Sequence, residues 1–258
     1  MPGSGANQMP GERIMVIRPL RDDDAFIALL NQSGAQVTQI PVIDIEPLEE
    51  EQAIKNLILD FDNMDIAIFV SGNAARFGLQ WLDQYWPMLP LGVQYLAVGR
   101  KTAEILQQHI GREGAGDVDF PAEQQNSEGL LALPQMQSVT GKRIVIFRGR
   151  QGRELLGQTL TARGANVTYC ELYKRIINTE NVAKAHQQLK QTDILVVHSG
   201  DLLKALGEVP DSQAAIVKVI VPSNRVADIA RQLGYSNIHI AASALPEAMY
   251  SSVKCLVN

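Results

Sequence analysis

A strand–loop–helix–strand pattern occurs twice in the sequence, and this repeat restricts the possible folds more than any other feature. The stretch Arg143–Arg175 contains an apolar run, a loop with arginines and glycines, a helical segment and a second strand-like segment. Residues 13–37 match residues 143–167 at an offset of 130. Residues 65–73 match residues 193–201 at an offset of 128. We therefore predict two similar halves.

The apolar runs indicate the fold class. Runs such as Ile66–Val70 and Ile144–Phe147 are short, rich in β-branched residues and bounded by polar residues. This pattern is typical of parallel strands that are buried on both faces. Because the runs alternate with amphipathic segments, we predict an α/β fold of parallel sheets flanked by helices, with right-handed crossovers. Ligands of such sheets bind where strand carboxyl ends meet helix amino ends.

Composition narrows the functional classes. The 258 residues suffice for two domains of ordinary size. A net charge of −5 argues against bulk attraction to nucleic acid or to anionic membranes. Two cysteines cannot form a disulfide framework, which fits a cytoplasmic protein, and the apolar runs are too short to cross a bilayer. Residues 1–12 are rich in glycine, proline and polar residues, and we expect them to form a disordered leader.

The motifs of several cofactor and catalytic classes are missing from the sequence. No Gly-x-Gly-x-x-Gly fingerprint, Walker loop or Gly-x-Ser-x-Gly elbow is present. The four histidines lack the spacing of metal ligands, so we expect neither a metal nor another cofactor. Small polar loops instead follow four predicted strands, and a loop with three arginines follows another; these loops are Ser71–Asn73, Lys101–Thr102, Arg148–Arg153, Ser199–Gly200 and Ser223–Asn224. Free backbone N–H groups at helix starts bind anions, so the loops predict a polyanionic small ligand.

Several short motifs, each weak alone, run from residue 14 to residue 248. They are the first strand with Arg18-Pro19, Phe69-Val-Ser-Gly-Asn-Ala, Ala97-Val-Gly-Arg-Lys-Thr-Ala, Arg148-Gly-x-x-Gly-Arg-Glu-x-Leu, Arg163-Gly-Ala-x-Val leading to Tyr173-x-Arg175, and Ser243-x-x-Pro-Glu-Ala. Together and in this order, they resemble the motifs of the uroporphyrinogen-III synthase family. The sequence departs from the family at residues 221–225, where the family more often has a glycine followed by Thr-Ala.

The resemblance implies a particular domain organisation. Residues 13–36 would join residues 176–258 in one domain, and residues 46–166 would form the other. Residues 37–45 and 167–175 would be two linker strands, with the active site in the cleft between the domains.

The resemblance also implies an activity. The family acts on hydroxymethylbilane, a linear tetrapyrrole with eight carboxylates, and closes it with inversion of ring D and loss of water. Tyr173 would be the proton donor, since tyrosine phenols ordinarily stay protonated at neutral pH. We expect a cytoplasmic monomer that binds neither nucleic acid nor membranes. The predicted substrate-binding residues are Arg18, Ser71, Gly72, Asn73, Lys101, Thr102, Arg148, Arg153, Ser199, Gly200, Ser223 and Asn224, with Arg150 as a further cation.

Other interpretations of these residues stay open. Ser71 and Ser199 are also good helix caps, and Tyr173 also suits a packed strand position. Arg150 also fits a solvated surface. A two-lobed, non-enzymatic sensor of a small polyanion is the alternative from another class. A two-domain glycosyltransferase would need a nucleotide-diphosphate site, which the sequence lacks.

Overall fold

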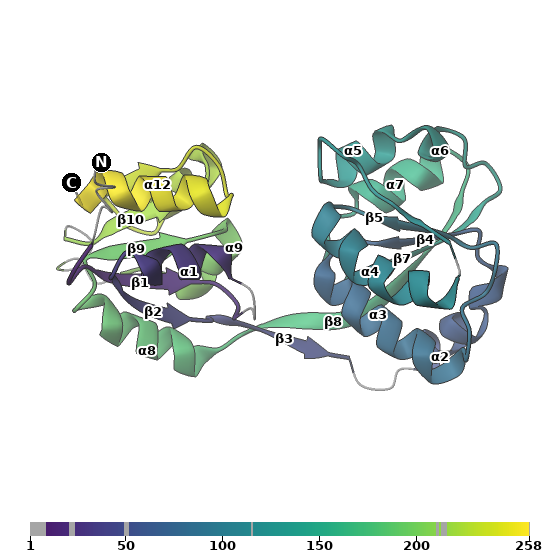
Figure 1. Ribbon diagram of the computed structural model, residues 1–258, viewed down its shortest axis with the longest axis horizontal. Helices are drawn as coiled ribbons and strands as arrows, with labels where there is room; N and C mark the ends of the chain where they lie inside the picture. Colours follow the sequence, from purple (N-terminus) through teal and green to yellow (C-terminus); the bar gives the residue numbers. More distant parts are fainter. Residues whose placement is uncertain are drawn as a thin grey trace, which may run out of the picture. The chain divides into compact units, whose positions relative to one another are not determined.

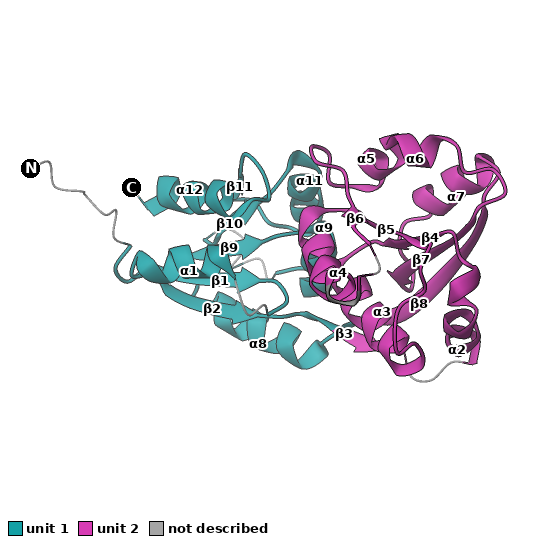
Figure 2. Cartoon of the chain, turned by 45° about the vertical axis from the view of Figure 1, so that its right-hand side comes forward, with its two compact units in different colours: residues 1–44, 176–258 teal, residues 45–175 magenta. Residues whose placement is uncertain are grey.

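The chain forms two compact units. The computed structural model describes residues 9–20, 24–48, 52–114, 116–209, 212 and 216–257. Unit 1 comprises residues 1–44 and 176–258, and unit 2 comprises residues 45–175 (Figure 2). Unit 1 is therefore assembled from two separate parts of the chain, whereas unit 2 is continuous. No helix of the described ranges is both long and apolar enough to span a membrane.

The sheet of unit 1 contains five strands in the order β11-β10-β9-β1-β2. Figure 1 labels β10, β9, β1 and β2, and Figure 2 also labels β11. All the pairings are parallel. The central strand β9 reads Ile-Leu-Val-Val and is buried along its length, as expected of a parallel strand covered on both faces. The strands are β1 (Arg13–Ile17), β2 (Gln36–Ile40), β9 (Ile194–Val197), β10 (Lys218–Val221) and β11 (Ile238–Ile240).

Helices cover both faces of this sheet. Successive side chains of a strand point to opposite faces, so Ile14 and Val16 of β1 enter one apolar cluster and Met15 and Ile17 enter the other. The first cluster is covered by α1 (Ala25–Gln32) and α12 (Pro246–Val257). The second is covered by α8 (Thr179–Leu189), α9 (Gly200–Leu206) and α11 (Asn224–Gln232).

The sheet of unit 2 has the order β3-β8-β7-β4-β5-β6. Without β3, this order corresponds strand for strand to β2-β1-β9-β10-β11 of unit 1, with β7 in the place of β1 and β4 in the place of β9. The prediction of two similar α/β halves with parallel sheets is confirmed. The strands are β3 (Ile43–Pro47), β4 (Ile66–Phe69), β5 (Gln94–Ala97), β6 (Val118–Asp119), β7 (Arg143–Gly149) and β8 (Asn166–Ile177).

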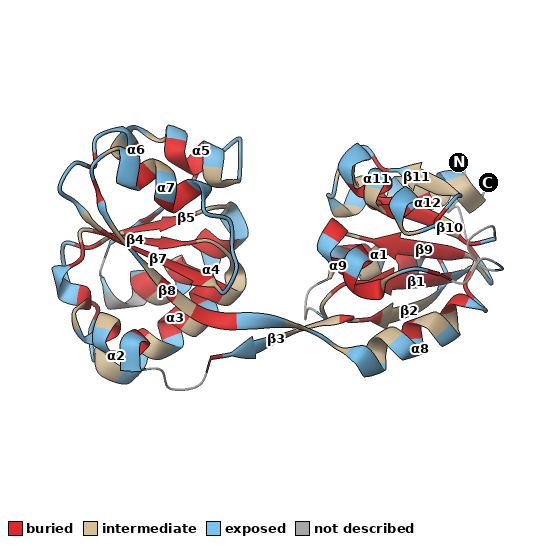
Figure 3. Cartoon of the chain, turned by 180° about the vertical axis from the view of Figure 1, so that it is seen from behind, coloured by how far each residue is buried: buried red, intermediate tan, exposed pale blue. Residues whose placement is uncertain are grey.

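The helices of unit 2 also form two layers, and the strands between them are buried (Figure 3). One face packs against α2 (Gln52–Leu59), α3 (Gly72–Tyr85), α4 (Arg100–Glu113) and the 3₁₀ helix η1 (Phe61–Asn63). The other packs against α5 (Ser127–Ala132), α6 (Pro134–Gln137) and α7 (Leu155–Ala162). The first core is aromatic: the rings of Phe69 and Phe147, from adjacent strands, stack with centroids 4.4 Å apart.

The two segments predicted as linkers are largely sheet strands. Residues 37–40 pair with β1 as part of β2, which ends before Pro41 because proline cannot donate a ladder hydrogen bond. Likewise, residues 167–173 pair with β7 as part of the 12-residue strand β8. The backbone N–H of Asn178 donates to the carbonyl of Val42 (3.0 Å). The chain therefore passes between the units as extensions of sheet strands.

The prediction of a disordered leader over residues 1–12 is wrong for residues 9–12. Residues 1–8 lie outside the described residues. Met9 is buried among α1, α12 and β1, and its N–H donates to the carbonyl of Ser33 (2.7 Å). Residues 9–12 therefore belong to unit 1, because the apolar side chain of Met9 completes the core on that face.

Four strand-to-helix connections share one backbone geometry. In each, one residue follows the strand and an extended residue then caps the helix, with φ near −160° and ψ near 160°. The cap positions are Ser71 and Gly99 in unit 2 and Ser199 and Ser223 in unit 1. Each sheet therefore presents two neighbouring helix amino ends at its carboxyl edge.

Candidate functional site

The candidate residues lie at the carboxyl edge of each sheet, near the point where the strand order changes direction. In unit 2 this point lies between β4 and β7, and in unit 1 between β9 and β1. Open α/β sheets bind ligands at such switch points. Tyr173, Ser71 and the arginine loop belong to the first edge, and Arg18 and Ser199 to the second.

Tyr173 and Ser71 form the closest contact among the predicted residues. Their hydroxyl oxygens are 3.0 Å apart, and either one can be the donor. The Tyr173 side chain is 3% exposed, and its ring packs at 5.7 Å from that of Phe77 on α3. Ser71 is also the N-cap of α3, where its Oγ accepts the N–H of Ala74 (3.1 Å). Ser71 therefore both caps α3 and contacts the hydroxyl of Tyr173.

A β-bulge turns Tyr173 toward Ser71. The pairing of β7 with β8 shifts after Arg148–Glu171, so that Gly149 lies opposite Tyr173 rather than Leu172. Leu172 and Tyr173 are consecutive yet enter the same core cluster, which regular alternation along a strand does not allow. A Cβ at position 149 would lie 2.5 Å from Cε2 of Tyr173, so only glycine leaves room for the ring. Gly149 therefore serves this close approach.

Arg148, a predicted substrate contact, is engaged inside unit 2. Its side chain is 3% exposed, its Nη2 lies 3.0 Å from Oε1 of Glu154, and its guanidinium lies 4.5 Å from the ring centre of Tyr169. The Tyr169 hydroxyl donates to the other oxygen of Glu154 (2.9 Å). The Tyr169 hydrogen bond and the nearby Arg148 lower the pKa of Glu154. These contacts favour a structural role for Arg148, which holds the loop that carries Gly149.

The other cations of unit 2 are more accessible. Arg153 and Lys101 are exposed, and neither forms an ion pair with any residue in the described part of the chain. Arg150 is half-exposed, with its Nε 3.8 Å from Glu171. Arg153 and Lys101 thus keep the charge that their predicted role requires.

The starts of α3 and α4 hold the remaining predicted residues of unit 2. Gly72 and Asn73 form the first turn of α3, where Oδ1 of Asn73 accepts from Nη2 of Arg76 (2.8 Å). Thr102 is buried in the first turn of α4. Because β4 and β5 are adjacent, these two helix starts are neighbours.

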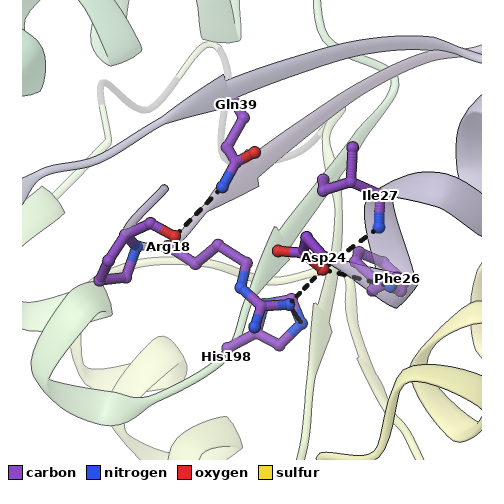
Figure 4. Close-up of polar contacts among 7 residues, drawn as sticks. Arg18, Asp24, Phe26, Ile27, Gln39 and His198 are labelled. Carbon is purple, nitrogen blue, oxygen red and sulfur yellow. Dashed lines mark hydrogen bonds and ion pairs between the residues drawn. The ribbon is translucent and has the colours of Figure 1, made fainter. Parts of the chain in front are cut away.

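In unit 1, Arg18 is held in a buried cluster (Figure 4). Its Nη1 lies 3.1 Å from Oδ1 of Asp24, and the two side chains are 9% and 6% exposed. The same nitrogen lies 3.2 Å from Nε2 of His198, which must accept because a guanidinium only donates. Asp24 also caps α1 by accepting the N–H groups of Phe26 (3.1 Å) and Ile27 (3.3 Å). Arg18, like Arg148, therefore binds to side chains of its own unit.

The other predicted residues of unit 1 begin two adjacent helices. Ser199 caps α9, where its Oγ accepts the N–H of Leu202 (3.3 Å), and Gly200 is the first residue of that helix. Ser223 occupies the cap position of α11 without a side-chain capping bond, and Asn224 follows it in an exposed position. The hydroxyl of Ser223 is thus not used in capping, unlike that of Ser199.

Sequence reasoning missed the acids that hold the two arginines. Asp24 follows Arg18 by six residues, and Glu154 follows Arg148 by six. In both units the acid sits at the start of the helix that follows the arginine's strand. The recurrence of this spacing in both repeats is the signal that identifies structural arginines.

The sites combine hydroxyl groups, helix amino ends and a few accessible cations. Helix amino ends and exposed cations favour bound carboxylates. Among the described residues, no group of three or more histidine, cysteine, aspartate or glutamate side chains is placed to hold a metal ion. The helix amino ends and exposed cations can bind anions, and the hydroxyl groups can donate protons.

Comparisons with known proteins agree on one family. A family model described as uroporphyrinogen-III synthase HemD matches residues 24–251. The uroporphyrinogen-III synthase of Escherichia coli K12 is 32% identical over 251 residues, which cover 93% of this chain and 99% of that protein.

Solved structures of low sequence identity have the same fold. A mutant uroporphyrinogen III synthase from the extremely thermophilic bacterium Thermus thermophilus has a TM-score of 0.60 at 19% identity, and the match covers 95% of this chain and 98% of that one. A uroporphyrinogen-III synthetase from Helicobacter pylori has a TM-score of 0.59 at 18% identity, with coverages of 95% and 99%.

Proposed function

Because the chain belongs to the uroporphyrinogen-III synthase family, we propose that it closes hydroxymethylbilane to uroporphyrinogen III. It is then an enzyme of tetrapyrrole biosynthesis that acts on a small molecule, and the alternative of a non-enzymatic sensor has no support from its relatives. The observation that carries the chemical part of the proposal is the buried Tyr173 hydroxyl beside Ser71, at the amino end of α3.

The proton donor is Tyr173. The C–O bond of the substrate's hydroxymethyl group breaks, and the phenolic proton leaves with the hydroxide as water. The exocyclic carbon then bonds to the substituted position of ring D, which gives a spiro intermediate. The bond from that position to the bridge carbon of ring C breaks, and the bridge carbon bonds to the free α position of ring D, which inverts ring D and closes the macrocycle. The proton that ring D releases on regaining its pyrrole form balances the one donated. Because this substrate loses hydroxide readily, orientation accounts for most of the catalysis.

The carboxylates of the substrate are held by helix starts and accessible cations. In unit 2 these are Gly72, Asn73, Lys101, Thr102 and Arg153. In unit 1 they are Ser199, Gly200, Ser223 and Asn224. Backbone N–H groups at helix amino ends suit carboxylates. Arg18 and Arg148 support these loops from inside each unit, since both are paired with buried or neighbouring acids.

The remaining expectations concern the setting of the enzyme. We propose a cytoplasmic monomer that binds neither nucleic acid nor membranes. The net charge of −5 supports the absence of polyanionic partners.

The decisive experiment is incubation of the purified chain with freshly generated hydroxymethylbilane, followed by separation of the product isomers. The type III isomer is expected in excess over a control without protein. Formation of the type I isomer alone, as in unaided closure, would refute the synthase assignment.

A further inference from the structure

We infer that Ser71 is a positioning residue for Tyr173: its hydroxyl donates to the phenolic oxygen and thereby directs the phenolic proton toward the substrate. The inference rests on the proposed role of Tyr173 and goes beyond it, because it assigns Ser71 a function other than binding a carboxylate. The geometry that carries it is the short contact between the two hydroxyls, 3.0 Å, inside a packed environment.

The number of hydrogen bonds that the Ser71 hydroxyl can donate and accept limits how it can bind to Tyr173. A serine hydroxyl has one proton to donate and two lone pairs that accept. One lone pair of Oγ already accepts the N–H of Ala74 (3.1 Å). If Ser71 donates to Tyr173, the phenolic proton remains free for transfer, and the serine hydrogen bond strengthens as the phenolate forms. If Tyr173 donates to Ser71, the phenolic proton is occupied and cannot leave with hydroxide. Proton donation by Tyr173 therefore requires the first arrangement.

The surroundings stabilise that arrangement. The hydrogen bond from Ala74 polarises the Ser71 hydroxyl, because linked hydrogen bonds strengthen one another. The positive amino end of the 14-residue helix α3 also favours negative charge nearby. Tyr173 cannot turn away easily, since its ring is confined by Phe77 on one side and by the backbone at Gly149 on the other.

In the described residues of unit 1, the serine equivalent to Ser71 makes only a helix-capping hydrogen bond. Ser199 lies at the position of Ser71 in the other repeat, and its Oγ accepts the N–H of Leu202. The position that matches Tyr173 in that repeat is Ile43, which has no hydroxyl. The pairing of two hydroxyls is therefore a specialisation of unit 2 and not a requirement of the repeated fold.

The test is a double-mutant cycle with Ser71→Ala, Tyr173→Phe and the double variant, assayed for formation of the type III isomer. We expect Ser71→Ala to lower kcat about tenfold with KM changed less than about twofold, the pattern of an interaction made in the transition state. In the Tyr173→Phe background, the same substitution should change kcat by less than about twofold, because residues that act as a unit are not additive.

Two further variants separate positioning from capping. Ser71→Thr retains the hydroxyl and the capping ability, so it should restore most of the lost kcat. Asn126→Ala removes a comparable cap from α5, where the Asn126 side chain accepts the N–H of Gly129 (2.9 Å), and it should lower the unfolding temperature without lowering kcat.

The outcomes distinguish failure of this inference from failure of the proposed function. A wild-type chain that yields only the type I isomer refutes the function itself. An unchanged rate for Tyr173→Phe removes the proton donor and the inference with it. Equal loss of kcat from Ser71→Ala in both backgrounds overturns the inference alone. So does a raised KM with unchanged kcat, which would assign Ser71 to carboxylate binding.

Discussion

The two units contain the same buried arginine in different surroundings. Arg18 directly follows β1, whereas Arg148, at the matching position of the repeat, lies near the end of β7. Each is paired with an acid six residues later. In unit 1 the acid is Asp24, whose side chain is 6% exposed, and the second contact of the arginine is His198. In unit 2 the acid is Glu154, 53% exposed, and the arginine stacks on Tyr169. Both units therefore contain a buried arginine paired with an acid, but the acid is buried in unit 1 and about half exposed in unit 2.

The residue that follows the arginine also differs between the two units. In unit 1, position 19 after the arginine is a proline, and its carbonyl accepts from Gln39 (3.2 Å). In unit 2 the matching position is Gly149, which lets the ring of Tyr173 approach the backbone. Unit 1 therefore uses this position for local order, whereas unit 2 uses it to make room for Tyr173, the proposed proton donor.

The largest expected effect comes from Asp24→Ala. Removing one partner of a buried ion pair costs about 3–5 kcal/mol, because the remaining charge stays buried without its counterion. The substitution also removes the cap of α1. Urea unfolding followed by circular dichroism measures the loss. Glu154→Ala is the matched variant in unit 2, and it should cost less because Arg148 keeps Glu171 (3.8 Å), the ring of Tyr169 and the carbonyl of Gly149 (3.2 Å) as partners. Equal losses would contradict this difference in the remaining partners.

An intermediate effect is expected from Gly149→Ala. The new Cβ would lie 2.5 Å from the ring of Tyr173, and such overpacking costs about 1–3 kcal/mol. Displacement of the phenol should also lower kcat to a value close to that of Tyr173→Phe. Gly111→Ala in α4 is the control, since its Cβ would meet only the side-chain amide of Gln107, at 3.1 Å, and alanine favours helices. Full activity of Gly149→Ala would show that the approach to Tyr173 is not needed.

The smallest expected effect is on the pH dependence of stability, and it involves a matched pair of aspartates, Asp193 and Asp65. Hydrogen bonds from Arg13 lower the pKa of Asp193 in unit 1, and hydrogen bonds from Arg143 and Lys142 lower the pKa of Asp65 in unit 2. A carboxyl whose folded pKa is depressed contributes stability above its ordinary value of 3.8, and this contribution is lost as the pH falls through the folded pKa.

Asp193→Asn should therefore reduce the free energy of unfolding at pH 7 slightly and flatten its decline below about pH 4. Asp65→Asn should do the same in unit 2. Urea unfolding at a series of pH values measures both. A decline as steep as that of the wild type in either variant would show that other carboxyls dominate acid unfolding in that unit.

Much of the fold was predictable because it depends on local pattern. Apolar runs such as Ile194–Val197 identify buried parallel strands, and the repeat indicates that both halves share one topology. Ser71 and Ser199 follow such runs, so their positions at helix starts were also predictable. These features are set by residues close in sequence.

The details of the site were less predictable because they depend on contacts between distant residues. Burial of Arg18 and Arg148 follows from partners on other elements, and it changes their expected role from substrate contact to internal support. The bulge opposite Gly149 is a matter of register between β7 and β8, which no single segment reveals. The contact between Ser71 and Tyr173 spans 102 residues for the same reason.

The division of unit 1 between the two ends of the chain has a consequence for biosynthesis. β1 needs β9 as its neighbour, so the edge of β1 stays unpaired on the ribosome until residues 194–197 have been translated. Unit 2 has all its strands by residue 177 and can assemble before then. A stop in translation between these points would release one finished half and one exposed strand edge, a form open to aggregation.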